Sequence, residues 1–285
     1  MRGVVLLLAV LAAGCTSAPP RYLVGDAYRM GGVWSYPRED FALVETGLAV
    51  RHPGPGFGAR TANDEAWSAG RALGAHRTLQ LPAVVTVTNL ENGRALTLRV
   101  NDRGPVDPGR VIGLSDRAAN LLGLPAGGAA QVRLAVDGER SRALAEGRRP
   151  PPVEIAAAPR AAVATESLAP PPGARGAAPV VAAAAAGPAA VAAAPPPRDE
   201  PLPETVVQGS PQPGRLVIET ATLGSASAAA ALAARIPGAR TEAFGPRRDR
   251  QHRVRLGPFA SVREADAALE RTRAAGVSGA RILVD

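Results

Sequence analysis

The 285-residue chain contains no lysine, a single cysteine and three histidines, and aromatic residues make up only 3% of it. All of its basic residues are therefore arginine, and the formal net charge is +8. Such a charge favours anionic partners, among them nucleic acid, lipid headgroups and cell-wall polymer. Because nucleic-acid strands are commonly held on aromatic stacking platforms, which this composition hardly offers, nucleic acid is the least expected partner. The single cysteine leaves no pair for a disulfide within the mature chain, and the scattered histidines do not predict a metal site.

The N-terminus has the features of a secretory signal. Met1-Arg2 gives a short positive start, and Val4–Ala13 is an apolar run that is too short to span a membrane as a mature helix. The run ends in "LAAGC", which resembles a bacterial lipobox, so residues 1–14 are predicted to be removed and Cys15 to carry lipid. The residue after the cysteine is Thr16 and not aspartate, which resembles outer-membrane lipoproteins facing the periplasm. An ordinary signal peptide with an incidental cysteine is the alternative.

Composition divides the remaining chain into four parts. We expect an N-terminal tether over residues 15–41, a β-domain over 42–137, a disordered linker over 138–213 and an α+β domain over 214–285. The linker prediction rests on Ala/Pro-rich low complexity, in which repeated prolines prevent one long helix. No further segment is long and apolar enough to span a bilayer.

The β-domain is predicted from alternating apolar residues. Candidate strands cover residues 42–50, 84–89, 95–100 and 131–136. Asn92-Gly93 between the second and third of these runs indicates a hairpin. Ser115 is a candidate N-cap for a helix over Asp116–Leu122 that Gly123 ends.

The C-terminal part alternates strands and helices in the order β-α-β-β-α-β, which predicts a ferredoxin-like fold. A capping box of Ser261 and Glu264 opens its second helix. The predicted elements are strands over 216–221, 239–244, 252–256 and 281–284, with helices over 225–235 and 261–275.

One apolar strand ends unexpectedly on a carboxylate. Leu96, Leu98 and Val100 alternate with polar residues, and the strand then reaches Asp102 beside Arg103, just before a Gly-Pro turn. An aspartate there can serve as a turn residue that hydrogen-bonds its own backbone. It can also serve as an acid, because a carboxyl group partly removed from water holds its proton more readily.

Four blocks around this strand occur in order: "ARTANDEAW", "GAHRTLQLP", "VTVTNLENGR" and "RVNDRGP". They resemble the double-psi β-barrel of the rare lipoprotein A family of septal-ring lytic transglycosylases. "HRVRLGPFASVREADAAL" is similar to the SPOR domain, which binds glycan strands lacking stem peptides at division sites. The resemblance implies a mostly β double-psi barrel, a disordered linker and a ferredoxin-like SPOR domain.

The family's motif residues fall on Asp102, His76 and Glu65, so the resemblance implies that these three act in glycan cleavage. Such cleavage needs an acid for the leaving oxygen, and then a base for the sugar's own 6-hydroxyl, which attacks C1 in place of water. One carboxyl group can perform both steps, and Asp102 is the candidate. Glu65 is expected to orient His76 or bind substrate hydroxyls. The alternatives are a buried structural histidine at position 76 and a helix-start charge at position 65.

The resemblance thus implies a lytic transglycosylase that cleaves MurNAc–GlcNAc bonds of peptide-free glycan and leaves 1,6-anhydro-MurNAc ends during cell division. We expect a monomer, concentrated at the septum, that needs no cofactor or metal. The alternative is a non-catalytic peptidoglycan-binding lipoprotein of the division site.

Several positions depart from the family pattern. Arg51, His52 and Pro53 replace an aromatic A-S-W-Y-G-like stretch, Asp64 stands where glycine is usual, and Gly113 replaces the aspartate of R-I-I-D-L-S. His52 and His252 match no motif and are expected to be surface or structural residues.

The SPOR-like domain departs as well, because "VIETAT" replaces V-Q-V-G-A-F in its first strand. Arg253 and Arg255 alternate outward on a later strand and are the candidate glycan-binding residues. The alternative, weighted equally, is that both arginines are solvated strand residues that bind no glycan.

Overall fold

The computed structural model describes residues 20–56, 58–147 and 202–285. The predicted lipidation site Cys15 and the greater part of the predicted linker lie outside these residues. In the part of the chain that the structure describes, no helix has the length and apolarity needed to cross a membrane.

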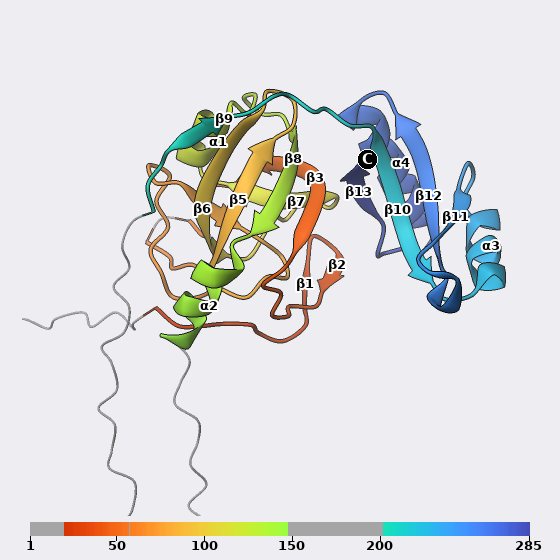
Figure 1. The fold of residues 1–285 in the computed structure, drawn as a ribbon, viewed down its shortest axis with the longest axis horizontal. Helices are drawn as coiled ribbons and strands as arrows, with labels where there is room; N and C mark the ends of the chain where they lie inside the picture. The colour runs from red at the N-terminus through yellow and green to blue at the C-terminus, as the bar shows by residue number, and fades with distance from the viewer. Residues whose placement is uncertain (1–19, 57, 148–201) are drawn as a thin grey trace, which may run out of the picture. The chain divides into compact units, whose positions relative to one another are not determined.

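The first domain is built mostly of strands, with two short helices (Figure 1). Its elements are β1 (Tyr28–Met30), β2 (Val33–Ser35), β3 (Val44–Arg51), β4 (Leu73–Ala75), β5 (Ala83–Asn89), β6 (Arg94–Asp102), β7 (Arg110–Leu114), α1 (Asp116–Leu122), β8 (Ala130–Val136), α2 (Gly138–Glu146) and, after the linker, β9 (Val206–Gln208).

Six of these strands close into a double-psi β-barrel, as the resemblance implied. The strand order is β4-β7-β3-β8-β5-β6, and a second pairing of β4 with β6 closes the ring. The β3–β7 and β4–β6 pairs are parallel and the remaining pairs are antiparallel. Closure of the ring gives each of the six strands two neighbours.

The barrel interior is filled by the apolar side chains that alternate along its strands. Val85, Val87, Leu96, Leu98 and Val100 are all buried in one cluster. The predicted hairpin between β5 and β6 is confirmed, with Gly93 at φ 77° in its turn. Helix α1 begins at the predicted cap, where the Ser115 side chain accepts from the amide of Ala118, and it ends at Gly123 in the left-handed conformation.

Two predicted boundaries differ from the structure. The predicted tether contains the β1–β2 hairpin, and a bridge between Leu23 and Leu81 ties this segment to the barrel. Both ends of the predicted linker are ordered as α2 and β9. The hairpin strands have only three residues each, and β9 obtains its partner from the barrel, so local periodicity does not reveal them.

Strand β9 covers a stretch of backbone that the barrel leaves open. Along β6, the short strand β4 reaches only the end near Asp102, and β9 pairs with the other end, over Arg94–Leu96. Glu204 fixes the segment before β9, because its carboxylate accepts from the amide of Ala72 at 2.7 Å and from Nε of Arg117 at 2.8 Å.

The second domain has the predicted ferredoxin-like order. Its elements are β10 (Leu216–Leu223), α3 (Ala226–Ala234), β11 (Arg240–Phe244), the short 3₁₀ helix η1 (Arg247–Asp249), β12 (Gln251–Phe259), α4 (Val262–Ala274) and β13 (Arg281–Val284). The antiparallel sheet has the order β11-β12-β10-β13. Strand β12 runs three residues beyond the predicted end at Leu256, through Gly257-Pro258.

Candidate active site

Asp102 is the last residue of β6, and its carboxylate has two unlike oxygen atoms. Oδ1 accepts hydrogen bonds from the backbone amides of Ala62 at 2.9 Å and Arg103 at 2.8 Å. Oδ2 accepts neither of these bonds and lies 3.5 Å from Nε2 of His52. The residue is 6% exposed. One oxygen is therefore anchored by the backbone, while the other is the atom that can exchange a proton.

The Asp102 carboxylate does not pair with the guanidinium of its neighbour Arg103. The Arg103 guanidinium donates instead to the carbonyl oxygens of Val24, His76 and Leu79. It thereby ties the end of β6 to the loop after β4 and to the N-terminal segment. The opposite directions of the two side chains agree with the alternation along an extended strand.

Glu65 lies in the loop between residues 61 and 66, and its carboxylate is fully engaged. Oε2 accepts from Nε of Arg99 at 2.9 Å and from Nδ2 of Asn101 at 3.1 Å. Oε1 accepts from Nη2 of Arg99 and from Nδ2 of Asn63 at 2.9 Å. Glu65 and Arg99 are 8% and 9% exposed, so they form a buried ion pair with bidentate geometry.

Burial raises the pKa of the Glu65 carboxyl, but the hydrogen bonds and charge of Arg99 and the bonds from Asn63 and Asn101 outweigh burial. The net result is a pKa below the ordinary value. Glu65 is thus held as a carboxylate, which suits an anchor better than an acid. The same loop carries the Ala62 amide that holds Oδ1 of Asp102, so Glu65 acts on Asp102 through the loop.

His76 follows β4, beside the end of β6. Its Nδ1 accepts from the backbone amides of Thr78 at 3.2 Å and Leu79 at 3.0 Å, so the ring proton lies on Nε2. Nε2 then donates to Oε1 of Glu45 at 2.8 Å. The backbone amide of His76 donates to the carbonyl oxygen of Asp102 at 3.0 Å. Through these bonds His76 shapes the turn after β4 and fixes the main chain of Asp102.

The three predicted site residues therefore surround the end of β6 without sharing a side-chain network. Over residues 20–56, 58–147 and 202–285, no hydrogen bond joins the side chain of Glu65 or His76 to the carboxylate of Asp102. Nor does a hydrogen bond in these ranges join Glu65 to His76, one of the two roles expected from the sequence; the Glu65 carboxylate binds Arg99 instead. In the same described ranges no three His, Cys, Asp or Glu side chains gather as a metal site.

The side chain whose nitrogen lies 3.5 Å from the free oxygen of Asp102 is that of His52, which sequence reasoning placed among surface or structural residues. It follows β3, its side chain is 10% exposed, and its backbone amide donates to the carbonyl of Leu114 at 2.7 Å. The sequence signal that could have indicated His52 is that positions 52 and 113 both depart from the family pattern. In the structure these two residues lie against each other. The neighbouring departure Arg51 points elsewhere, to Asp116 and Asn120 of α1.

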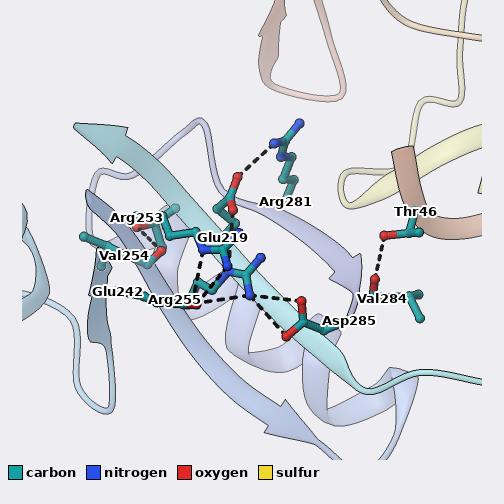
Figure 2. Close-up of polar contacts among 10 residues, drawn as sticks. Thr46, Glu219, Glu242, Arg253, Val254, Arg255, Arg281, Val284 and Asp285 are labelled. Atoms are coloured by element: carbon teal, nitrogen blue, oxygen red, sulfur yellow. Dashed lines mark hydrogen bonds and ion pairs between the residues drawn. The ribbon is translucent and has the colours of Figure 1, made fainter. Parts of the chain in front are cut away.

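Arg253 and Arg255, the predicted glycan-binding residues, lie on the sheet of the second domain within a network of ion pairs (Figure 2). Arg253 pairs with Glu242 at 2.8 Å. Arg255 lies 3.0 Å from Asp285, 3.5 Å from Glu219 and 3.6 Å from Glu242. These arginines are therefore matched by carboxylates of their own domain.

A shallow pocket of about 330 Å³ opens beside this network. Arg255, Glu242 and Asp285 line it together with Arg215 and Arg240. It offers several guanidinium donors and two carboxylates, a mixture suited to a polymer that carries many hydroxyl groups.

Comparisons with known proteins agree with this division of the chain. Residues 55–134 match the lytic transglycolase family and residues 212–282 match the SPOR domain. An endolytic peptidoglycan transglycosylase RlpA of Campylobacter jejuni is 43% identical over 114 residues, covering 39% of this chain and 41% of the relative.

Further relatives bear the same name. The protein of Rickettsia bellii is 38% identical over 116 residues (40% of this chain, 51% of the relative). The protein of Vibrio cholerae is 32% identical over 161 residues, which cover 46% of this chain and 61% of that relative. The chain thus spans about half the length of these relatives. Its two described domains are thus similar, in order, to the lytic transglycolase family and to the SPOR domain.

Proposed function

We propose that this protein is a peptidoglycan lytic transglycosylase whose acid and base is Asp102. The observation that carries the proposal is the asymmetry of the Asp102 carboxylate. Two backbone amides hold Oδ1, so the carboxyl group has one fixed orientation and presents Oδ2 for proton exchange. The match of the barrel to the lytic transglycolase family supports this assignment.

The reaction needs one carboxyl group because the proton returns to it. Protonated Oδ2 gives its proton to the glycosidic oxygen between MurNAc and GlcNAc, and the bond from that oxygen to C1 breaks. The Asp102 carboxylate then takes the proton of the MurNAc 6-hydroxyl as O6 bonds to C1. The products are a free GlcNAc 4-hydroxyl end and a 1,6-anhydro-MurNAc end, and no water is consumed.

Other barrel residues prepare this group. Glu65 and Arg99 fix the loop that supplies the Ala62 amide, and His76 holds the Asp102 carbonyl. Their predicted part in cleavage is then to position Asp102, since their own polar atoms are occupied by protein partners. Preorganisation of this kind reduces the reorganisation needed during the reaction.

The hairpin beside the His76 loop supplies surfaces for sugar rings. Trp34 and Tyr36 are exposed, at 55% and 66%. Arg77 connects the hairpin to the loop by donating to the Met30 carbonyl at 3.2 Å and to the Ser35 hydroxyl at 3.3 Å. Aromatic faces so placed would compensate for the aromatic stretch that Arg51–Pro53 replaced.

The SPOR domain would hold peptide-free glycan at the division site, with Arg253 and Arg255 as the proposed contacts. Both arginines are held in ion pairs, so glycan binding would depend on the fixed arrangement of these pairs on the sheet. A tethered binding domain raises the effective concentration of glycan near the barrel without adding contacts there. Lipidation at Cys15 would attach the protein to the outer membrane, facing the periplasm.

Digestion of amidase-treated, peptide-free peptidoglycan tests the proposal. The chain from residue 16 onward retains every described residue and is compared with Asp102→Asn and with Asp107→Asn, an exposed aspartate nearby. We expect anhydro-ended fragments, identified by mass, from the wild type and from Asp107→Asn but not from Asp102→Asn. Glycan binding without fragments from the folded wild type would refute the activity and favour a non-catalytic peptidoglycan-binding protein.

A further inference from the structure

His52 lies in a slot beside the Asp102 carboxylate. Its Nε2 is 3.5 Å from Oδ2 and is buried, yet no hydrogen bond reaches it from any residue that the structure describes. On another side the ring meets Trp67 edge to face, with ring centroids 5.1 Å apart and planes at 82°. Buried polar atoms almost always have a hydrogen-bond partner, so this unpaired nitrogen calls for an explanation.

Two glycines form the walls of this slot. A Cβ atom at Gly113 would lie 2.8 Å from Cβ and 3.1 Å from Cγ of His52. A Cβ atom at Gly104 would lie 3.0 Å from Cε1 of the same ring. The φ of Gly113 is outside the left-handed region, so its backbone conformation does not demand glycine. The neighbouring side chain does, because a Cβ at position 113 would lie 2.8 Å from Cβ of residue 52, closer than real Cβ atoms come.

The slot also orients the ring. The backbone of His52 is fixed by its hydrogen bond to Leu114 at the end of β7. The edge-to-face contact with Trp67 restricts rotation of the imidazole ring. Trp67 itself packs against Gly54, where an added Cβ would lie 2.3 Å from its Cδ1. The imidazole is therefore held by packing, and Nε2 is aimed at the one oxygen of Asp102 that the backbone leaves free.

We infer that His52 is a positioning residue for Asp102, an inference that rests on the proposed transglycosylase function. Nε2 holds Oδ2 in the orientation from which the carboxyl exchanges its proton with substrate, and Gly113 leaves room for the side chain at position 52. The distance of 3.5 Å is longer than a hydrogen bond and shortens when substrate fills the site, as catalytic hydrogen bonds commonly do.

Steady-state kinetics on soluble peptide-free glycan test the inference with three substitutions of His52. His52→Phe keeps a ring against Trp67 but removes both nitrogens. His52→Gln places an amide near the position of Nε2, whereas His52→Asn reaches only the position of Nδ1. We expect kcat to fall about 100-fold in His52→Phe with KM unchanged, since misplacing a catalytic group by about 1 Å has such an effect.

The matched pair separates positioning from packing. We expect His52→Gln to retain more of kcat than His52→Asn, and His252→Phe in the second domain to leave kcat unchanged. Gly113→Ala moves the ring and is expected to lower kcat as well. A folded His52→Phe with wild-type kcat, or equal losses in His52→Gln and His52→Asn, would overturn the inference.

A spectroscopic readout does not depend on turnover. The chain has three histidines, so the ¹⁵N resonance of His52 Nε2 can be assigned by substitution. We expect it to move in Asp102→Asn and to stay in Asp107→Asn, and no movement in Asp102→Asn would overturn the pairing. If the wild type releases no anhydro product, the proposed function fails, while this experiment still decides whether His52 and Asp102 interact.

Discussion

The Glu65–Arg99 pair gives the sharpest test of how the barrel prepares its acid. Glu65→Gln removes the negative charge and replaces one acceptor oxygen by an amide nitrogen, which cannot accept from Arg99 or Asn101. The Arg99 guanidinium is then buried without a counter-charge, as its side chain is 11% exposed. Removing one partner of a buried pair costs about 3 to 5 kcal/mol. We expect the free energy of unfolding to fall by about 3 kcal/mol, because the glutamine still accepts through one oxygen.

The loss depends on pH in a defined direction. The folded-state pKa of Glu65 lies below its ordinary value of 4.5, so the unfolded chain binds this proton more readily. The stabilisation is complete above that ordinary value and is lost as the pH falls through the lower folded-state pKa. The stability difference between wild type and Glu65→Gln is therefore expected to be largest near neutral pH and to shrink in acid.

Urea unfolding followed by tryptophan fluorescence measures this quantity for the barrel, because both tryptophans, Trp34 and Trp67, belong to it. Glu139→Gln, at an exposed position in the first turn of α2, is the matched control. The reasoning is wrong if Glu65→Gln unfolds like the wild type at pH 7 while its glycan cleavage is abolished. That result would make Glu65 a reacting group and not an anchor.

Three further changes test other parts of the barrel. Asp64→Gly should raise the free energy of unfolding by about 1 kcal/mol, because Asp64 has a left-handed φ of 66° and its surface ion pair with Arg21 contributes little. Urea unfolding measures the change, and a decrease in the free energy of unfolding would contradict the prediction. Glu204→Gln should speed amide hydrogen exchange in Val206–Gln208, because it weakens the contacts of this segment to Arg117; unchanged protection would refute this. Leu98→Ala, at a fully buried position, should lower the unfolding free energy by about 2 to 5 kcal/mol, and a smaller loss would mean that the core repacks.

The elements that were predictable from the sequence are those whose signal is local. Helix α1 has its cap at Ser115 and its stop at Gly123, and β13 (Arg281–Val284) was predicted to the residue. Short β4 was not predicted, since three residues carry no measurable period and their partners lie far along the chain. Strand β9 was missed for the same reason.

The site was predictable in part. Asp102 stands out because an alternating apolar strand ends on a carboxylate, and the family blocks add Glu65 and His76. The sequence does not reveal that Glu65 binds Arg99, because the partners are 34 residues apart and meet only when the loop folds against β6. Nor does it reveal the pairing of His52 with Gly113, which depends on the parallel register of β3 and β7.

That register changes how departures from a family pattern should be interpreted. Counted separately, an imidazole at position 52 and a missing aspartate at position 113 each argue against activity. In the folded barrel, a Cβ at position 113 would lie 2.8 Å from Cβ of His52, so the two positions are in direct contact. The imidazole nitrogen reaches the free oxygen of Asp102, where it supplies a polar partner for the acid. The departures therefore describe an altered surrounding for Asp102, and the His52 variants measure how much that surrounding contributes to cleavage.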